Sequence, residues 1–125
     1  MSPAPLRLYS YPRCSTCRKA LQWLAQQGFS VQSGTLELLD ITQNPPDLEA
    51  LRSAFRSLGR KRLFNTSGQS YRALGSAVVA AMSDEEALQA LAADGKLIKR
   101  PFAITESGSA LVGFKPEEWQ AALLG

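Results

Sequence analysis

The sequence predicts an α/β protein in which a strand, a helix and a strand come first, helices fill the middle, and two strands and a helix come last. Three observations predict this order. A short segment near the start alternates apolar and polar residues, the middle repeats apolar residues at helical spacing, and turn residues separate short apolar segments near the end. A chain of 125 residues that is 45% apolar can bury its own core, so we expect residues 1–125 to form one domain.

The first third has the pattern of a strand–helix–strand unit. Residues 6–10, "LRLYS", alternate like a short strand, and apolar residues recur at helical spacing from Ser15 until Gly28, a residue suited to end a helix. Residues 31–41, "VQSGTLELLDI", predict a second strand with a bulge at Gly34. The length of this unit suits a parallel strand pair.

The middle of the chain is predicted to be helical. Residues 44–59, "NPPDLEALRSAFRSLG", place leucines and a phenylalanine on one face, after prolines that fit a first turn and before a glycine. Residues 60–70, "RKRLFNTSGQS", predict a polar loop, with a turn at "NTSG". Residues 71–82 predict short apolar helical pieces.

A capping signal starts the next predicted helix. Ser83 and Glu86 have the spacing of a capping box at the start of residues 84–94, and Gly95 is expected to end this helix. Pro116 fits the first turn of a terminal helix. The other elements expected in the last third are a strand at 96–100, which ends before Pro101, and a hairpin of residues 102–106 and 110–114 around the turn "SGS".

Composition excludes several classes of function. The chain has no histidine, which excludes histidine-based catalysis and histidine metal sites, and its net charge of +3 is too small to predict direct nucleic-acid binding. No apolar run reaches the roughly 18 residues of a membrane span, and the first ten residues do not resemble a signal peptide. We therefore expect a cytoplasmic monomer with no membrane contact, in a compartment where thiols are reduced.

The two cysteines of the chain form one C-x-x-C motif, Cys14 and Cys17, where the first strand gives way to the first helix. Unpaired amide groups and the helix dipole stabilise a thiolate at this position. Arg13, Arg18 and Lys19 add positive charge, and together these features are expected to lower the pKa of Cys14. Cys14 is therefore the candidate nucleophile.

Cys17 lies one helical turn after Cys14, within reach of a disulfide after a modest adjustment, and could resolve an adduct on Cys14. Two other interpretations of the motif stay open. The pair could be half of a metal site, although the chain offers neither a second C-x-x-C nor histidines, so we expect no resident metal. Alternatively, both cysteines could simply pack in the core.

Four segments in the same order resemble the arsenate reductase (ArsC) family, which includes the Spx regulators and glutaredoxin-like reductases. The segments are "LYSYPRCSTCRKALQWL", "LFNTSGQSYRAL", "SDEEALQALAADGKLIKRPF" and "LVGFKPEEW". The resemblance implies a thioredoxin-like fold with a mixed sheet, formed by residues of about 6–41 and 96–124, with a helical insertion at about 42–95. The motif with Cys17 resembles the glutaredoxin-like members most.

The resemblance also implies roles for single residues. Cys14 matches the family's nucleophile, Arg100 matches an arginine that holds the substrate oxyanion, and Pro101 matches a proline whose peptide bond is usually cis. Arg100 could instead be a solvated arginine at a strand end.

Further basic residues are candidates for substrate binding. Arsenate reductases place three arginines around the thiolate; here the middle one falls near Lys61 or Arg62 and the last on Lys115, which lacks the bidentate geometry of arginine. Arg13 is a further candidate beside Cys14. Each of these residues could also be an ordinary exposed cation.

Together, these features predict a thiol-dependent oxidoreductase. Its expected substrate is a small anion such as arsenate, or a disulfide or glutathione adduct. We expect it to need an external thiol reductant, either glutathione with glutaredoxin or thioredoxin. We expect no tightly bound cofactor. The alternative is an Spx-like redox-sensing regulator whose partner is the α subunit of RNA polymerase.

Overall fold

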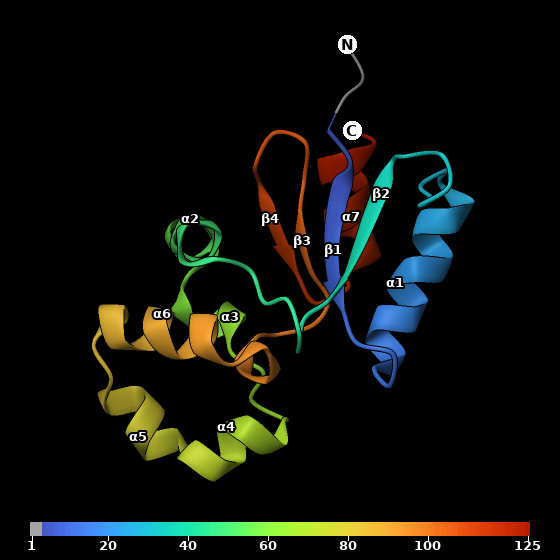
Figure 1. Cartoon of the computed structure of the whole chain (residues 1–125). Coiled ribbons are helices and arrows are strands. Elements are labelled where there is room, and N and C mark those ends of the chain that lie inside the picture. The colour runs from blue at the N-terminus through green and yellow to red at the C-terminus, as the bar shows by residue number, and fades with distance from the viewer. Residues whose placement is uncertain (1–3) are drawn as a thin grey trace.

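A four-stranded mixed sheet forms the centre of the protein, whose computed structural model describes residues 4–125. The strands lie in the order β2-β1-β3-β4 (Figure 1). β1 pairs with β2 in parallel, and the β1–β3 and β3–β4 pairs are antiparallel. The strands are β1 (Leu6–Ser10), β2 (Leu36–Asp40), β3 (Phe102–Ile104) and β4 (Ala110–Val112). The predicted α/β class and mixed sheet are confirmed.

The helices divide into two groups. α1 (Ser15–Gln26) connects β1 to β2, and α7 (Pro116–Leu123) follows β4, as the sequence predicted. The others lie between β2 and β3: α2 (Leu48–Leu58), α3 (Arg60–Leu63), α4 (Gln69–Leu74), α5 (Ser76–Ala81), α6 (Asp84–Ala93) and the 3₁₀ turn η1 (Gly95–Leu97). We call α2 to η1 the insertion, and the four strands and their adjoining residues, with α1 and α7, the sheet half. Within residues 4–125, no helix has the length and apolar character to cross a bilayer.

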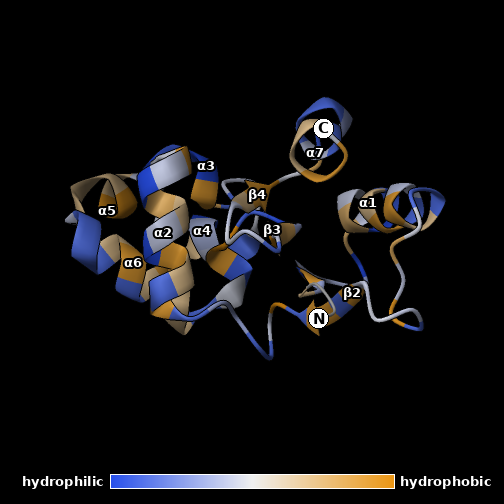
Figure 2. Cartoon of the chain, turned by 90° about the horizontal axis from the view of Figure 1, so that it is seen from above, coloured by the Kyte–Doolittle hydropathy of each residue, from blue (hydrophilic) through white to orange (hydrophobic). Residues whose placement is uncertain are grey.

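The sheet separates two hydrophobic cores because successive residues of a strand point to opposite faces. Leu8 packs with Leu24 of α1 and Trp119 of α7 on one face. Tyr9 and Phe102 pack with the buried side chains of the insertion on the other face. Figure 2 shows the insertion on one side of the strands, with α1 and α7 on the other.

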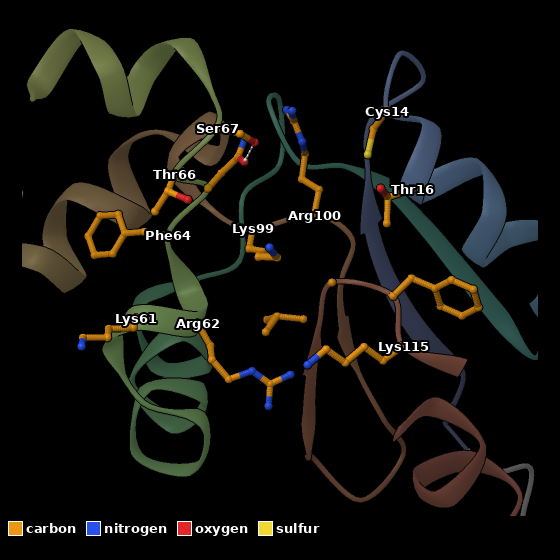
Figure 3. Close-up of a pocket in the computed structure, with 14 residues that line it drawn as sticks. Cys14, Thr16, Lys61, Arg62, Phe64, Thr66, Ser67, Lys99, Arg100 and Lys115 are labelled. Atoms are coloured by element: carbon orange, nitrogen blue, oxygen red, sulfur yellow. Dashed lines mark hydrogen bonds between the residues drawn. The ribbon is translucent and has the colours of Figure 1, made fainter. Parts of the chain in front are cut away.

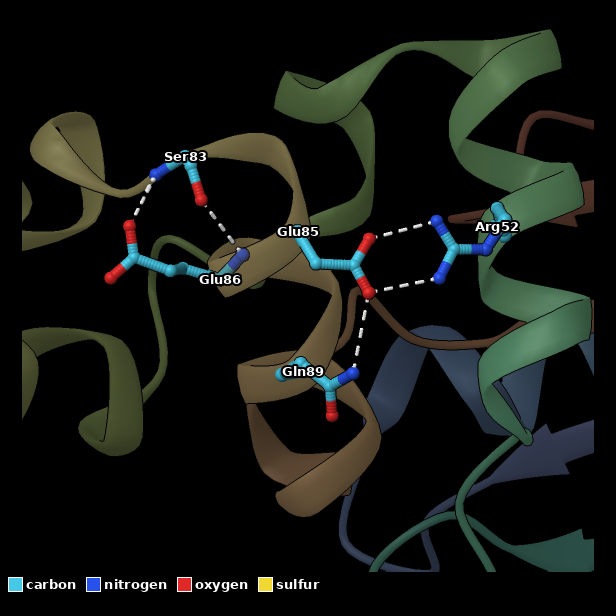
Figure 4. Close-up of polar contacts among 5 residues, drawn as sticks. All are labelled: Arg52, Ser83, Glu85, Glu86 and Gln89. Carbon is cyan, nitrogen blue, oxygen red and sulfur yellow. Dashed lines mark hydrogen bonds and ion pairs between the residues drawn. The ribbon is translucent and has the colours of Figure 1, made fainter.

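Local capping explains where several helices begin. Asp47 caps α2 by accepting a hydrogen bond from the backbone N–H of Ala50 at 2.8 Å. Ser83 and Glu86 form the predicted capping box at the start of α6 (Figure 4). Just after α6, Gly95 at the start of η1 lies close to the backbone of Ile41, which follows β2. A Cβ atom at position 95 would lie 1.8 Å from the carbonyl oxygen of Ile41. This close approach requires glycine.

Three predicted elements differ from the structure. The second strand begins at Leu36 rather than at residue 31, because a turn closed by a hydrogen bond from Gly34 N to Val31 O precedes it. The predicted loop at 60–70 begins with a helix, α3, whose Leu63 is buried in the core. The predicted strand at 96–100 was wrong: η1 covers its start, and Ile98 forms a single bridge to residue 64.

Candidate functional site

Cys14 lies at the junction that the sequence predicted, between β1 and α1, and caps the helix. Its Sγ accepts a hydrogen bond from the backbone N–H of Cys17 at 3.2 Å, and its own N–H donates to the carbonyl of Tyr11 at 3.0 Å. The sulfur thus lies against the amide groups at the positive end of the helix dipole. Unpaired amide groups at a helix N-terminus are donors that can hold an anion.

Cys17 lies in a different environment, although only one helical turn separates it from Cys14. Its side chain is 1% exposed. Burial, and then a hydrogen bond between the two thiols, raise the pKa of Cys17 to about 12, while the N–H of Tyr11 and the charge of Arg100 oppose this rise. Cys17 is therefore a protonated thiol at neutral pH that can donate to the sulfur of Cys14. No disulfide joins Cys14 and Cys17 in the structure.

A cavity of about 550 Å³ opens beside Cys14, between the sheet half and the insertion. Figure 3 shows Cys14 and Thr16 on one side and Thr66 and Ser67 on the other. Its cationic lining residues are Lys61, Arg62, Lys99, Arg100 and Lys115, and its uncharged ones are Cys14, Thr16, Phe64, Asn65, Thr66, Ser67, Val112, Gly113 and Phe114. Within the described part of the chain, this lining contains no carboxylate. Such a surface attracts anions toward Cys14.

Arg100 lies between this cavity and a neighbouring hollow of about 330 Å³. Its guanidinium carbon is 5.0 Å from the centre of the Tyr11 ring, a cation–π contact that holds the side chain in place. In Figure 3 the side chain of Arg100 projects between Ser67 and Cys14. The peptide bond between Arg100 and Pro101 is cis, as the family resemblance implied.

The two candidates for the middle cation point in different directions. Figure 3 shows Arg62 directed toward Lys115 across the cavity, and Lys61 directed away from both. Arg62 Nη2 donates to Glu118 Oε1 at 2.9 Å, and Lys115 Nζ is 3.8 Å from Glu118 Oε2. The hydrogen bond from Arg62 lowers the pKa of Glu118 below its usual value. Arg62 is therefore the insertion's principal cation at this site.

The structure brings most of the predicted site residues to one cavity, but not all. Cys14, Arg62, Arg100 and Lys115 line it with Lys61. Cys17 and Pro101 are buried, and neither lines the cavity. Arg13, also predicted to bind substrate, is exposed and is not among the lining residues that the structure describes, so it receives no support as a ligand.

Sequence reasoning missed part of the lining. Lys99 lines the cavity, but nothing in the sequence distinguished this lysine from an ordinary exposed cation beside Arg100. The turn at "NTSG" is present, with Gly68 N donating to Asn65 O at 3.1 Å, but its residues also line the cavity. Glu118 was missed because its contact with Arg62 joins residues far apart in the chain. No group of three or more potential metal ligands occurs within residues 4–125.

Comparison with known proteins places this geometry in a family. The ArsC family model matches residues 9–122. The chain is 39% identical over 118 residues to YusI of Bacillus subtilis (strain 168), across 92% of this chain and 95% of YusI. It is 28% identical over 121 residues to an arsenate reductase of Neisseria meningitidis serogroup A, across 94% of this chain and 97% of that protein.

Solved structures agree with the sequence comparison. The crystal structure of a possible arsenate reductase from Streptococcus mutans UA159 superposes with a TM-score of 0.81 and 39% identity. The match covers 94% of this chain and 98% of that chain. The thioredoxin-like fold implied by the resemblance is confirmed by this likeness and by the observed sheet order.

Proposed function

We propose, because this chain belongs to the ArsC family, that it is a thiol-dependent oxidoreductase with Cys14 as nucleophile and Cys17 as resolving cysteine. One observation supports this assignment above the others. The sulfur of Cys14 accepts an amide hydrogen bond at the start of α1 and faces a cationic cavity, while the thiol of Cys17 is buried against it. The two sulfurs therefore have different environments that suit different steps.

In the first step, the Cys14 thiolate attacks a sulfur of a disulfide substrate, such as a glutathione mixed disulfide. A new S–S bond forms at Cys14, the S–S bond of the substrate breaks, and the leaving thiolate takes up a proton from solvent. With arsenate, the sulfur of Cys14 would instead bond to arsenic, and an arsenate oxygen would take up protons from solvent and leave as water. When Cys17 then attacks that sulfur, the As–S bond would break with its electron pair on arsenic, which leaves as arsenite. Both reactions need a thiolate and a site that tolerates negative charge.

In the second step, Cys17 loses its proton and attacks the sulfur of Cys14. The Cys14–Cys17 disulfide forms and the bound thiolate leaves, so the two electrons given to the substrate come from the two cysteines. An external thiol reductant, glutathione with glutaredoxin or thioredoxin, returns these electrons. Because burial raises the pKa of Cys17, this step should become faster as pH rises.

The cations of the cavity support substrate binding rather than electron transfer. Lys99 and Arg100 lie in the segment just before β3, next to the cysteine motif, and Arg100 is held on Tyr11. An arginine guanidinium can donate two parallel hydrogen bonds to a carboxylate or an oxyanion. We propose that Arg100 donates hydrogen bonds to the negatively charged group of the substrate, and that the positive charge of Lys99 attracts the substrate into the cavity.

A turnover assay tests this function. The reduced protein is incubated with arsenate or with a glutathionylated peptide, and each reaction is coupled separately to a thioredoxin system and a glutaredoxin system. We expect NADPH consumption in at least one combination and its loss in Cys14→Ser. Equal rates in wild type and Cys14→Ser, or no turnover in any combination, would contradict the proposal.

A redox-sensing regulator stays the alternative prediction. A binding assay distinguishes the two: the carboxy-terminal domain of the α subunit of RNA polymerase is immobilised and exposed to the reduced and the oxidised protein. The reductase proposal expects no retention in either state. Retention that depends on the oxidation of Cys14 and Cys17 would favour the regulator.

A further inference from the structure

We propose that Glu118 determines substrate specificity, as a built-in counter-ion that disfavours small, doubly charged oxyanions at the cavity. The proposal rests on the proposed function, because it concerns which anion approaches Cys14. Glu118 lies in the first turn of α7 and is not itself a lining residue. Its carboxylate instead contacts two of the cations that are.

The first observation is the position of the Glu118 carboxylate between two elements. One oxygen is 2.9 Å from Nη2 of Arg62 in the insertion, and the other is 3.8 Å from Nζ of Lys115 in the sheet half. Figure 3 shows the side chains of Arg62 and Lys115 pointing toward one another across the cavity. The carboxylate therefore makes the contacts that an oxyanion bound between these two cations would make.

The second observation concerns competition for hydrogen-bond donors. Arg62 is half-buried, with 37% of its side chain exposed, and it turns part of its guanidinium fork to Glu118. An anion that enters between Arg62 and Lys115 must displace this carboxylate or lie near its negative charge. The penalty grows with the charge of the anion, so a dianion suffers more than a monoanionic peptide group.

Lys99 and Arg100, in contrast, make no salt bridge with any residue in the range 4–125. They lie on the segment that leads into β3, on the same cavity as Cys14. Of the five cationic lining residues, Arg62 and Lys115 are therefore occupied by the protein's own carboxylate, whereas Lys99 and Arg100 are available to substrate. The fifth, Lys61, points away from both of the occupied cations in Figure 3. This arrangement favours a substrate with a single negative group near its reactive sulfur over a compact dianion.

The test uses inorganic phosphate, which has the shape and charge of arsenate but is not reduced. Phosphate that occupies the cavity should slow the alkylation of Cys14 by iodoacetamide, measured by peptide mass spectrometry. In Glu118→Gln we expect half-maximal protection at a phosphate concentration about 3- to 10-fold lower than in wild type. The gain should shrink at high salt, since partly exposed charges are screened.

Glu117→Gln is the matched control, because it removes the same charge from the neighbouring residue of α7, and Glu117 makes none of the salt bridges found within residues 4–125. We expect no change in phosphate protection for this variant. An equal gain in both variants would show a general charge effect and overturn the proposal. No gain in Glu118→Gln, or no phosphate protection in any variant, would overturn it as well.

Arg62→Met provides a second, independent variant. If Glu118 acts by occupying Arg62, the gain from Glu118→Gln should be mostly lost when Arg62→Met is already present. An undiminished gain in the double variant would overturn the assigned contact. These binding measurements need no turnover, so they can succeed even if the proposed reductase activity fails. With activity present, Glu118→Gln should also shift the ratio of kcat/KM toward arsenate and away from a glutathionylated peptide.

Discussion

The sheet half and the insertion differ in what they bring to the cavity. The sheet half supplies both cysteines, on a helix anchored by its own hydrophobic core with α7. The insertion supplies Arg62 and the turn at residues 65–67, from a separate core on the other face of the sheet. The cavity is therefore built from both parts, with the reactive sulfur of the proposed function on the sheet half and Arg62 on the insertion.

Besides the packing of Tyr9 and Phe102 on the insertion, a few close backbone and polar contacts join these two parts. Gly95 lies against the carbonyl of Ile41, and Lys99 N donates to the carbonyl of Leu63 at 2.8 Å. Arg62 and Glu118 add an ion pair between α3 and α7. Variants at these contacts test how the two parts are held together, whereas variants at the cysteines test the chemistry.

Gly95→Ala should have the largest effect. The new methyl group would lie 1.8 Å from the carbonyl oxygen of Ile41, so the backbone must move, and we expect a loss of about 3 kcal/mol or more in the free energy of unfolding. Gly108→Ala is the control, since it meets no atom within 4 Å but has a φ of +89°, which predicts a loss of about 1–2 kcal/mol. Urea denaturation measures both. A Gly95→Ala protein as stable as Gly108→Ala would contradict this contact.

The next effect is a fall in the free energy of unfolding at alkaline pH, caused by Cys17 of the sheet half. Burial raises the pKa of Cys17 above its ordinary value of 9.0. The folded state therefore keeps a proton that the unfolded state loses, and this contribution to stability, complete below pH 9, disappears as pH rises toward the folded pKa. Urea denaturation of the reduced protein at about pH 8 and about pH 10 measures the loss.

Cys17→Ala is the comparison for this measurement. Tyr9, whose pKa burial also raises, titrates in both proteins, so only the difference between them reports on Cys17. We expect Cys17→Ala to lose less stability than wild type over this pH range. An equal loss in both would show that Cys17 is not the group responsible.

Phosphate protection of Cys14 should show which of two cations binds the anion: Lys99, which the structure places in the cavity, or Arg13, which only the sequence predicted. Lys99→Met removes a cavity cation, and we expect about 3- to 10-fold weaker protection. Arg13→Met removes the same charge from an exposed residue that does not line the cavity, and we expect less than about a twofold change. The reverse order would restore the sequence-based assignment of Arg13 and weaken the structural one.

The smallest expected effect lies within the insertion. Arg52 of α2 makes a bidentate contact with Glu85 of α6, at 2.9 and 3.0 Å (Figure 4). Exposed ion pairs contribute little, so Arg52→Met should lower the melting temperature only slightly more than Arg56→Met on the same helix. Added salt should remove this difference. A large loss in Arg52→Met alone would show that the pair holds the insertion together.

Local signals in the sequence predicted much of the sheet half and the start of one helix of the insertion. The C-x-x-C at a strand–helix boundary placed Cys14 correctly as the residue before α1. The capping residues Ser83 and Glu86 placed the start of α6, and turn residues placed the hairpin of β3 and β4. Each of these features depends on neighbours within a few residues.

The features that sequence reasoning missed depend on distant contacts. Residues 60–63 carry one apolar side chain in four, too few to show a helical period, and Leu63 is fixed by the core that it enters. Residues 96–100 place two apolar residues between basic ones just before Pro101, which suits a short strand. Instead, the side chain of Asp94 accepts a hydrogen bond from the backbone N–H of Lys96 and starts a 3₁₀ turn. The pairing of Arg62 with Glu118 joins residues 56 positions apart, which no local pattern encodes.

The most direct test of the account is the mass of the adduct formed at Cys14. Reduced Cys17→Ser is mixed with a glutathionylated peptide and digested under acidic conditions that prevent disulfide exchange. We predict one glutathione on Cys14 in this variant, and a Cys14–Cys17 disulfide with free glutathione in wild type. An unmodified Cys14 in the variant, or a wild type that keeps its glutathione, would contradict the assignment of the two cysteines.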